Sequence, residues 1–219
     1  MNFLKTKLMC ISILLASVVS AEQIDTQTIA EEWTSYGMGV VRYQNRMVFM
    51  KEAEETSGVG VMSPEAYGEN VVLRYELMPM TPASVCVAVL SASDNGDGQS
   101  LTFAEDYDGG IGMWTRDTLN YFFAFHNQAH DSKPFVRRFQ PEFVQFAVAD
   151  DNVMHTGKFY TVEVGRKGAM LWLEVDGVRL FEAEDPSPLG GGHIGFRIRG
   201  IKGMQAACLI RNVSVTEAP

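Results

Sequence analysis

The segment 120–138, NYFFAFHNQAHDSKPFVRR, holds two of the chain's four histidines, a lysine and two adjacent arginines against one aspartate, in a chain of net charge −9. An arginine fork binds a carboxylate through two hydrogen bonds. A histidine, whose pKa lies near working pH, can remove a proton from the carbon beside that carboxylate. A tyrosine near a cation can protonate the departing oxygen. These are the groups that elimination from a sugar acid requires.

The expected site has catalytic His126, Tyr121, Arg137 and Tyr107, and substrate-binding Arg138, Arg116, Asn120, Trp114, His130 and Lys133. His126 is the expected base, one of the two tyrosines is the acid, and the arginines neutralise the carboxylate. Tyr121 and His126 have opposite parity, so on a regular strand they face opposite sides of a sheet. A bulge, or Tyr107 as the acid, would resolve this conflict. The alternative is that these residues are ordinary exposed side chains, with the tryptophan in the core.

Carboxylates for glycoside hydrolysis form a weaker pattern. The nearest match to two acids along one strand is Glu174-Val175-Asp176-Gly177, but Asp176-Gly177 is typical of a turn. This arrangement disfavours the paired-carboxylate mechanism. A second acidic group, Glu105, Asp106 and Asp108 in FAEDYDGG, could hold a sugar hydroxyl or a cation, although a solvated loop is the simpler interpretation.

No cofactor is expected. Asp94 and Asp97, in DNGDG, are closely spaced oxygen ligands that could hold a structural calcium ion, but the bidentate glutamate of an EF-hand is missing. A polar turn is the favoured interpretation. His126 and His130 have the spacing of a helical zinc pair, whereas this segment favours a strand and a loop, so no metal site is predicted there.

Residues 1–21 have the pattern of a secretory signal: Lys5 and Lys7, a short apolar run, and small residues ending at Ala21. We expect cleavage after Ala21 and export to a bacterial periplasm, leaving residues 22–219 as one domain. Loss of the two lysines changes the formal charge from −9 to −11. Nucleic acid and anionic membranes, which require clustered positive charge, are therefore improbable partners.

Two cysteines remain after this cleavage. Cys86 and Cys208 each lie in an apolar run that favours a strand. They could be buried free thiols, or they could pair in an oxidising compartment. The sequence does not choose between the two.

Strand signals dominate the chain. Short runs rich in β-branched and aromatic residues recur between glycine, proline, aspartate and asparagine, at 71–77, 84–90, 159–164 and 171–175. Asp176-Gly177 between two alternating runs predicts a hairpin. Short helical turns are expected near 26–32 and 63–67, and residues 22–67 are expected to add an N-terminal strand and loops. The pattern predicts an all-β, two-sheet antiparallel sandwich.

The last third of the chain, with LWLEVDGVRLF, DPSPLGGG and HIGFRIRG, resembles the closing strands of the concanavalin-A-like lectin/glucanase jelly rolls. The segment LNYFFAFHN followed by VRRF is similar to the YesU-like branch of that superfamily. The first resemblance implies a jelly-roll sandwich with a sugar on its concave sheet. The second implies a role in breaking down uronate-rich polysaccharides.

The sequence thus predicts an exported enzyme that acts on an acidic oligosaccharide or polysaccharide by lyase- or dehydratase-type elimination. Two alternatives stay open: a carbohydrate-binding module without catalysis, and a glycoside hydrolase that uses other carboxylates.

Overall fold

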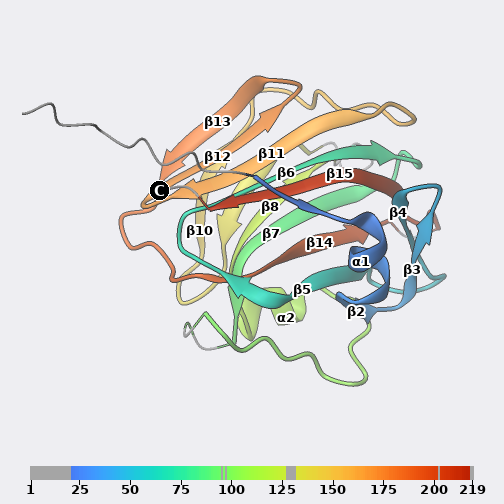
Figure 1. Ribbon diagram of the computed structural model, residues 1–219, viewed down its shortest axis with the longest axis horizontal. Helices are drawn as coiled ribbons and strands as arrows, with labels where there is room; N and C mark the ends of the chain where they lie inside the picture. The colour runs from blue at the N-terminus through green and yellow to red at the C-terminus, as the bar shows by residue number, and fades with distance from the viewer. Residues whose placement is uncertain (1–20, 95, 97, 127–131, 202, 218–219) are drawn as a thin grey trace, which may run out of the picture.

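The computed structural model describes residues 21–94, 96, 98–126, 132–201 and 203–217. These residues form two antiparallel sheets packed face to face, so the predicted β-sandwich is confirmed (Figure 1). The expected signal segment lies almost entirely outside the described residues.

One sheet has eight strands in the order β13-β12-β11-β6-β15-β4-β3, with β1 paired to β15. Its strands are β1 (Glu22–Ile24), β3 (Gly39–Gln44), β4 (Met47–Glu52), β6 (Val71–Pro79), β11 (Tyr160–Lys167), β12 (Met170–Val175), β13 (Val178–Glu184) and β15 (Ala207–Glu217). Strands that are far apart in the chain lie side by side in this sheet, since β6 and β15 pair at its centre.

The other sheet has seven strands in the order β10-β9-β8-β7-β14-β5-β2. Its strands are β2 (Thr34–Gly37), β5 (Val59–Tyr67), β7 (Val85–Ser93), β8 (Leu119–Phe125), β9 (Phe135–Arg138), β10 (Val144–Val148) and β14 (Gly192–Arg199). This sheet carries four residues of the predicted site, Asn120 and Tyr121 on β8 and Arg137 and Arg138 on β9. We call the face that it turns away from the eight-stranded sheet its outer face.

The expected hairpin is present between β12 and β13. Asp176 and Gly177 have φ angles of 52° and 78°, as a two-residue turn with two left-handed positions requires. A short helix, α1 (Thr26–Glu31), confirms the first expected helical turn, and Asp25 caps it by accepting from the Gln27 N–H. The second expected turn was wrong, because residues 63–67 continue strand β5. Residues 22–67 contribute five strands, more than the sequence suggested.

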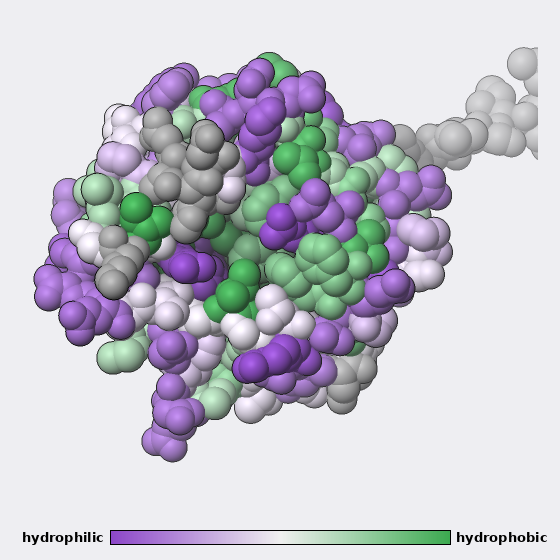
Figure 2. Space-filling view, turned by 180° about the vertical axis from the view of Figure 1, so that it is seen from behind, coloured by the Kyte–Doolittle hydropathy of each residue, from purple (hydrophilic) through white to green (hydrophobic). Residues whose placement is uncertain are grey.

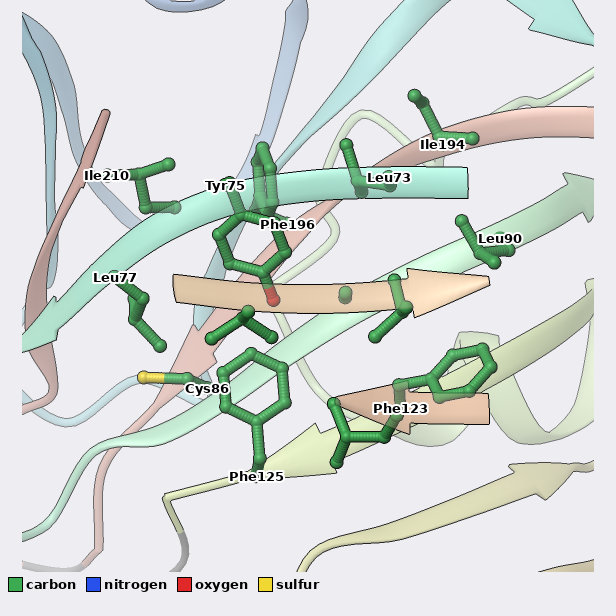
Figure 3. Packing of buried hydrophobic residues seen from close by; sticks show 14 of the residues in the cluster. Leu73, Tyr75, Leu77, Cys86, Leu90, Phe123, Phe125, Ile194, Phe196 and Ile210 are labelled. Atoms are coloured by element: carbon green, nitrogen blue, oxygen red, sulfur yellow. The ribbon is translucent and has the colours of Figure 1, made fainter. Parts of the chain in front are cut away.

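The core lies between the sheets and is rich in aromatic rings. Tyr75 of β6 packs edge-on against Phe196 of β14, with ring centroids 4.8 Å apart, and against Phe125 of β8 (Figure 3). Each fully buried phenyl group of this kind stabilises the fold by about 1.5–3 kcal/mol. Leu73 and Phe123 extend the same layer.

No helix among the described residues is long and apolar enough to cross a membrane.

Candidate functional site

Strand β8 separates its side chains as its alternation predicts. Tyr121, Phe123 and Phe125 point into the core between the sheets. Phe122 and Ala124 belong to a second apolar cluster on the outer face. Tyr121 therefore lies on the core side of β8, as its parity predicted.

The hydroxyl of Tyr121 belongs to a buried polar network. It donates to Asp185 Oδ2 at 2.7 Å and accepts from the Leu189 N–H at 2.9 Å. Arg138 Nη1 donates to the same Asp185 oxygen at 2.5 Å. Asp185 is fully buried and Arg138 is 5% exposed. Burial, followed by the hydrogen bond to Asp185, raises the pKa of Tyr121 to about 12, so this hydroxyl keeps its proton at neutral pH.

Arg166 completes this interior network. Its side chain donates to the carbonyl oxygens of Leu189 and Gly190 and to Ser91 Oγ, and its guanidinium lies 5.3 Å from the centre of the Tyr121 ring. The network therefore fastens the segment DPSPLGGG to both sheets. Tyr121 and Arg138 are held inside the sandwich in this structure, away from its outer face.

Arg137 points the opposite way, because consecutive strand residues alternate. Its guanidinium lies 3.8 Å from the centre of the Phe135 ring, and two of its nitrogens donate to Gln145 Oε1 at 2.9 and 2.7 Å. No carboxylate pairs with it among the described residues. Partial burial lowers its pKa. The structure thus does not bring Arg137 and Arg138 together, and the two cannot share one carboxylate.

His126 lies just beyond β8 in a left-handed conformation, with φ at 50°. Its Nδ1 lies 2.6 Å from the carbonyl oxygen of Ser84, so Nδ1 carries the proton and donates. Nε2 is buried and has no hydrogen-bond partner among the described residues. Burial lowers the pKa of His126, and the nearby His155 lowers it further. The ring is therefore neutral at pH 7, with an unpaired lone pair on Nε2.

A cover formed by residues 98–118 lies over part of the outer face. It contains α2 (Gly112–Arg116) and packs Phe103 and Trp114 against Tyr36 and Phe122. Trp114 is fully buried, so its ring meets side chains of the protein. The interpretation of this tryptophan as a core residue fits the structure.

Asn120 anchors the cover to β8. Its amide nitrogen donates to the carbonyl oxygens of Trp114 at 3.0 Å and Thr118 at 3.1 Å. Asn120 is fully buried, and in this position its amide holds the chain beside α2.

Tyr107 and Arg116 lie together at the rim of the cover, in a hollow of about 470 Å³ that Asp106 and Asp108 also line. Tyr107 donates to the Gly110 carbonyl oxygen at 2.5 Å, and burial raises its pKa. Arg116 is exposed. These two residues are near each other, but they lie at the cover, whereas His126 follows β8 and Arg137 lies on β9.

The remaining expectations concern loop residues. Lys133 is exposed, just before β9. His130 and Asp97 lie outside the described residues. Asp94 accepts a hydrogen bond from the Thr102 N–H at 3.0 Å, as in a polar turn. Within the described part of the chain, no group of three or more His, Cys, Asp or Glu side chains could hold a metal ion. The favoured polar turn and the alternative of a structural calcium ion at Asp94 and Asp97 both stay predictions.

Arg197 and Arg199, in the run HIGFRIRG, also belong to the outer face, although the sequence predicted no site role for them. Arg197 of β14 is 3% exposed and donates to the carbonyl oxygens of Ser57 and Gly109, so it fastens the cover. Arg199, two residues on, lines a hollow of about 710 Å³ at the end of β14. The alternation in FRIR was the available signal, because it places both arginines on one face.

Seen from the side opposite to Figure 1, the surface is hollowed near its centre, where apolar and polar side chains lie next to one another (Figure 2). Phe135, Phe139 and Val87 are among the outer-face apolar residues, and Phe143, beside Arg137, is 59% exposed. A ligand with flat apolar faces and an anionic group would match Arg137 and its aromatic neighbours.

No protein-family model matches this chain, and no curated protein matches it. Solved structures do. A Bacillus subtilis protein of unknown function with a galectin-like fold has a TM-score of 0.76 and 13% identity, over 90% of this chain and 98% of that one. The kappa-carrageenase from Pseudoalteromonas carrageenovora, in complex with an oligotetrasaccharide of kappa-carrageenan, has a TM-score of 0.62 and 8% identity, over 95% and 99%. A carbohydrate-binding module from Bacillus subtilis, CBM66, has a TM-score of 0.58 and 11% identity, over 84% and 94%.

These likenesses define the class of the fold. The protein has a galectin-like, concanavalin-A-like jelly roll, as the resemblance in its closing strands implied. The identities are low, so the likeness concerns the fold alone. The YesU-like branch stays a prediction.

Proposed function

We propose that this protein binds an acidic saccharide on the outer face of the seven-stranded sheet, with Arg137 contacting the carboxylate. The observation that carries this proposal is the state of Arg137. Its guanidinium is half-buried, lies over the Phe135 ring, and among the described residues is hydrogen-bonded only to the neutral Gln145. A cation in a strongly acidic chain that has no acidic partner is ready for an anionic ligand.

The neighbours of Arg137 suit a sugar ring. Phe143 is largely exposed, and its ring centre lies 5.9 Å from the Arg137 guanidinium. A sugar can place its C–H face on an aromatic ring while its carboxylate reaches the guanidinium. Proteins with this fold include an enzyme solved with a carrageenan oligosaccharide and a carbohydrate-binding module. These neighbours support a saccharide, and Arg137 supports its acidic character.

Affinity for uronate oligosaccharides, compared with neutral oligosaccharides of equal length and linkage, tests this proposal. We expect Arg137→Gln to weaken uronate binding by about 10- to 100-fold, which corresponds to about 1.5–3 kcal/mol for a hydrogen bond to a charged group. Arg137→Lys should recover part of the loss, because the charge stays and the fork is lost. Arg179→Gln, on the eight-stranded sheet, is the matched control. Equal affinity for neutral and acidic sugars would overturn the proposal.

A second candidate function is elimination at the uronate, with His126 as the base. The specific observation is its tautomer: donation from Nδ1 to Ser84 leaves a neutral Nε2 free to accept a proton. In this reaction Nε2 takes the proton beside the carboxylate, the C–O bond at the next carbon breaks, and the leaving oxygen is protonated. Of the two predicted acids, Tyr107 lies at the cover with its hydroxyl donating to the Gly110 carbonyl oxygen, and Tyr121 is enclosed between the sheets, so the acid of this reaction is not assigned.

Product analysis by mass spectrometry separates the candidates. Loss of water, or cleavage that yields a new carbon–carbon double bond, supports elimination. Products that have gained water support a hydrolase, and an unchanged ligand that still binds supports a binding module. His126→Asn is the matched variant, because asparagine tolerates a positive φ and can still donate to Ser84. If this variant retains full turnover, His126 is not the base.

We also propose that the chain is exported to the periplasm, on the strength of the signal pattern in residues 1–21. N-terminal sequencing of protein from fractionated cells tests this. A mature chain that starts at Glu22 is expected, and retention of residues 1–21 on cytoplasmic protein would exclude it.

A further inference from the structure

Cys86 and Cys208 face each other across the core. Cys86 lies in β7 of the seven-stranded sheet and Cys208 in β15 of the eight-stranded sheet. Their exposed fractions are 2% and 0%, and both are free thiols. Both side chains belong to the same buried core cluster, and the neighbouring Cys208 thiol helps to raise the pKa of Cys86. Figure 3 shows Cys86 between the sheets, near Leu77 and Phe125.

The sheets are fastened to each other beside these cysteines. Ser84 Oγ donates to the Ala207 carbonyl oxygen at 3.0 Å and accepts from the Ala207 N–H at 3.1 Å. Thr81 Oγ1 donates to the Gln205 carbonyl oxygen at 2.8 Å. Ser84 lies two residues before Cys86, so their side chains share one face, and Ala207 directly precedes Cys208. These bonds hold the two strands close together at the position of the thiols.

We propose that Cys86 and Cys208 form a disulfide that links the two sheets when the chain folds in an oxidising compartment. A thiolate of one cysteine attacks a disulfide donor, either a thiol–disulfide oxidoreductase or oxidised glutathione, and the second cysteine displaces it. The two cysteines together lose two protons and two electrons, and the donor leaves as two thiols. This inference does not depend on the proposed function.

The bond must form before the core closes. In the folded protein both thiols are shielded from solvent, and the neighbouring Cys208 thiol together with burial keeps the pKa of Cys86 well above its ordinary value. A donor therefore reaches them during folding. Once formed, the bond closes a loop of over a hundred residues, which strongly restricts the unfolded chain.

Peptide mapping tests the proposal. The full chain is produced once by export to the periplasm of a bacterial host and once in its reducing cytosol. Both preparations are unfolded in guanidinium with iodoacetamide and digested without reduction. We expect a cross-linked peptide pair that contains Cys86 and Cys208 in the exported protein, whereas Cys86 and Cys208 should both be alkylated in the cytosolic protein. Alkylation of both Cys86 and Cys208 in the exported protein would overturn the proposal.

Thermal unfolding tests the link between the sheets without any substitution. The exported protein is reduced while unfolded and then refolded with reductant present. Its midpoint should fall by about 10 °C relative to the oxidised form. The double variant Cys86→Ala, Cys208→Ala is the control, and its midpoint should not respond to reductant. Equal midpoints for the oxidised and reduced wild-type protein would show that no bond links the sheets.

Discussion

Arg138 and Asp185 form an ion pair inside the sandwich, with Nη1 and Oδ2 2.5 Å apart and the carboxylate fully buried. The two residues are 47 positions apart in the chain. Tyr121 shares the same carboxylate oxygen, and the Ser187 N–H donates to the other one. One buried carboxylate thus joins β8, β9 and the segment that leads into β14.

Asp185→Asn should destabilise the protein strongly. The substitution keeps the shape but removes the charge, which leaves Arg138 buried without a counter-charge, at a cost of about 3–5 kcal/mol. Urea unfolding followed by tryptophan fluorescence measures this. Glu182→Gln is the matched control, because Glu182 also pairs with an arginine, but at the surface, and its loss should cost less than about 1 kcal/mol. Equal effects of the two variants would contradict the assignment of a buried pair.

Tyr121→Phe should reduce stability and leave saccharide binding unchanged. The variant removes the acceptor of the Leu189 N–H and one donor to Asp185, at a cost of about 1–3 kcal/mol. Measuring the free energy of unfolding, the affinity for the saccharide and the turnover of the variant distinguishes a structural role of Tyr121 from a catalytic one. If turnover is lost while stability is unchanged, Tyr121 acts in catalysis and the structural interpretation fails.

The same residue predicts a dependence on alkaline pH. The ordinary pKa of tyrosine is 10.0, and the folded protein raises that of Tyr121 to about 12. Between these values the unfolded chain loses the proton first, so the stability that Tyr121 contributes is present below pH 10 and is lost as pH rises toward 12. The free energy of unfolding, measured between pH 10 and 12, should decline less steeply with pH in Tyr121→Phe than in the wild-type protein. Part of the decline in stability should remain in both proteins, because burial also raises the pKa of other tyrosines, such as Tyr75.

His126 predicts that the protein loses stability as the pH becomes acidic. Its pKa lies below the ordinary 6.5, chiefly because of burial, so the unfolded chain binds the proton more readily. The stability due to neutral His126 is present above pH 6.5 and is lost as pH falls through its folded-state pKa. His126→Asn should weaken this loss while keeping the bond to Ser84. A variant with the same acid dependence as the wild-type protein would show that another group is responsible.

Gly109 and Gly157 offer a matched test of the cover. Their φ angles are +87° and +81°, so alanine is strained at both positions, by about 1–2 kcal/mol. At Gly109 a methyl group would also collide with the Gly58 carbonyl, whereas at Gly157 no atom lies within 4 Å. Gly109→Ala should therefore displace the cover and make residues 98–118 sensitive to protease. Gly157→Ala should not. Equal protection in both variants would mean that the Gly58 contact does not hold the cover.

Much of the fold was predictable because strand alternation is a local property. The run 120–125 indicated which side chains face the core, and the structure places Tyr121 and Phe123 there. Asp176-Gly177 predicted its hairpin because both residues tolerate the left-handed conformation that the turn requires. The segment 63–67 was misjudged, since its short polar stretch continues a strand whose earlier residues are buried between the sheets.

The candidate site was less predictable, because its residues meet partners that are far away in the chain. Adjacent arginines suggested a pair, yet alternation alone already sends Arg137 and Arg138 to opposite faces. No feature of the sequence near Arg138 indicates that Asp185 is its partner. The burial of Trp114 depends on the cover folding back over the outer face, which no local pattern indicates.

The sequence by itself therefore determined the strands, the two faces of each strand and the sandwich class, because these follow from residue-by-residue alternation and turn chemistry. Only the tertiary structure decided that Tyr121 and Arg138 lie in a buried network while Arg137 is left without an acidic partner among the described residues. The physical reason is that a buried charge requires a partner in space, and the packing of two sheets, not the order of residues, determines which carboxylate lies within reach.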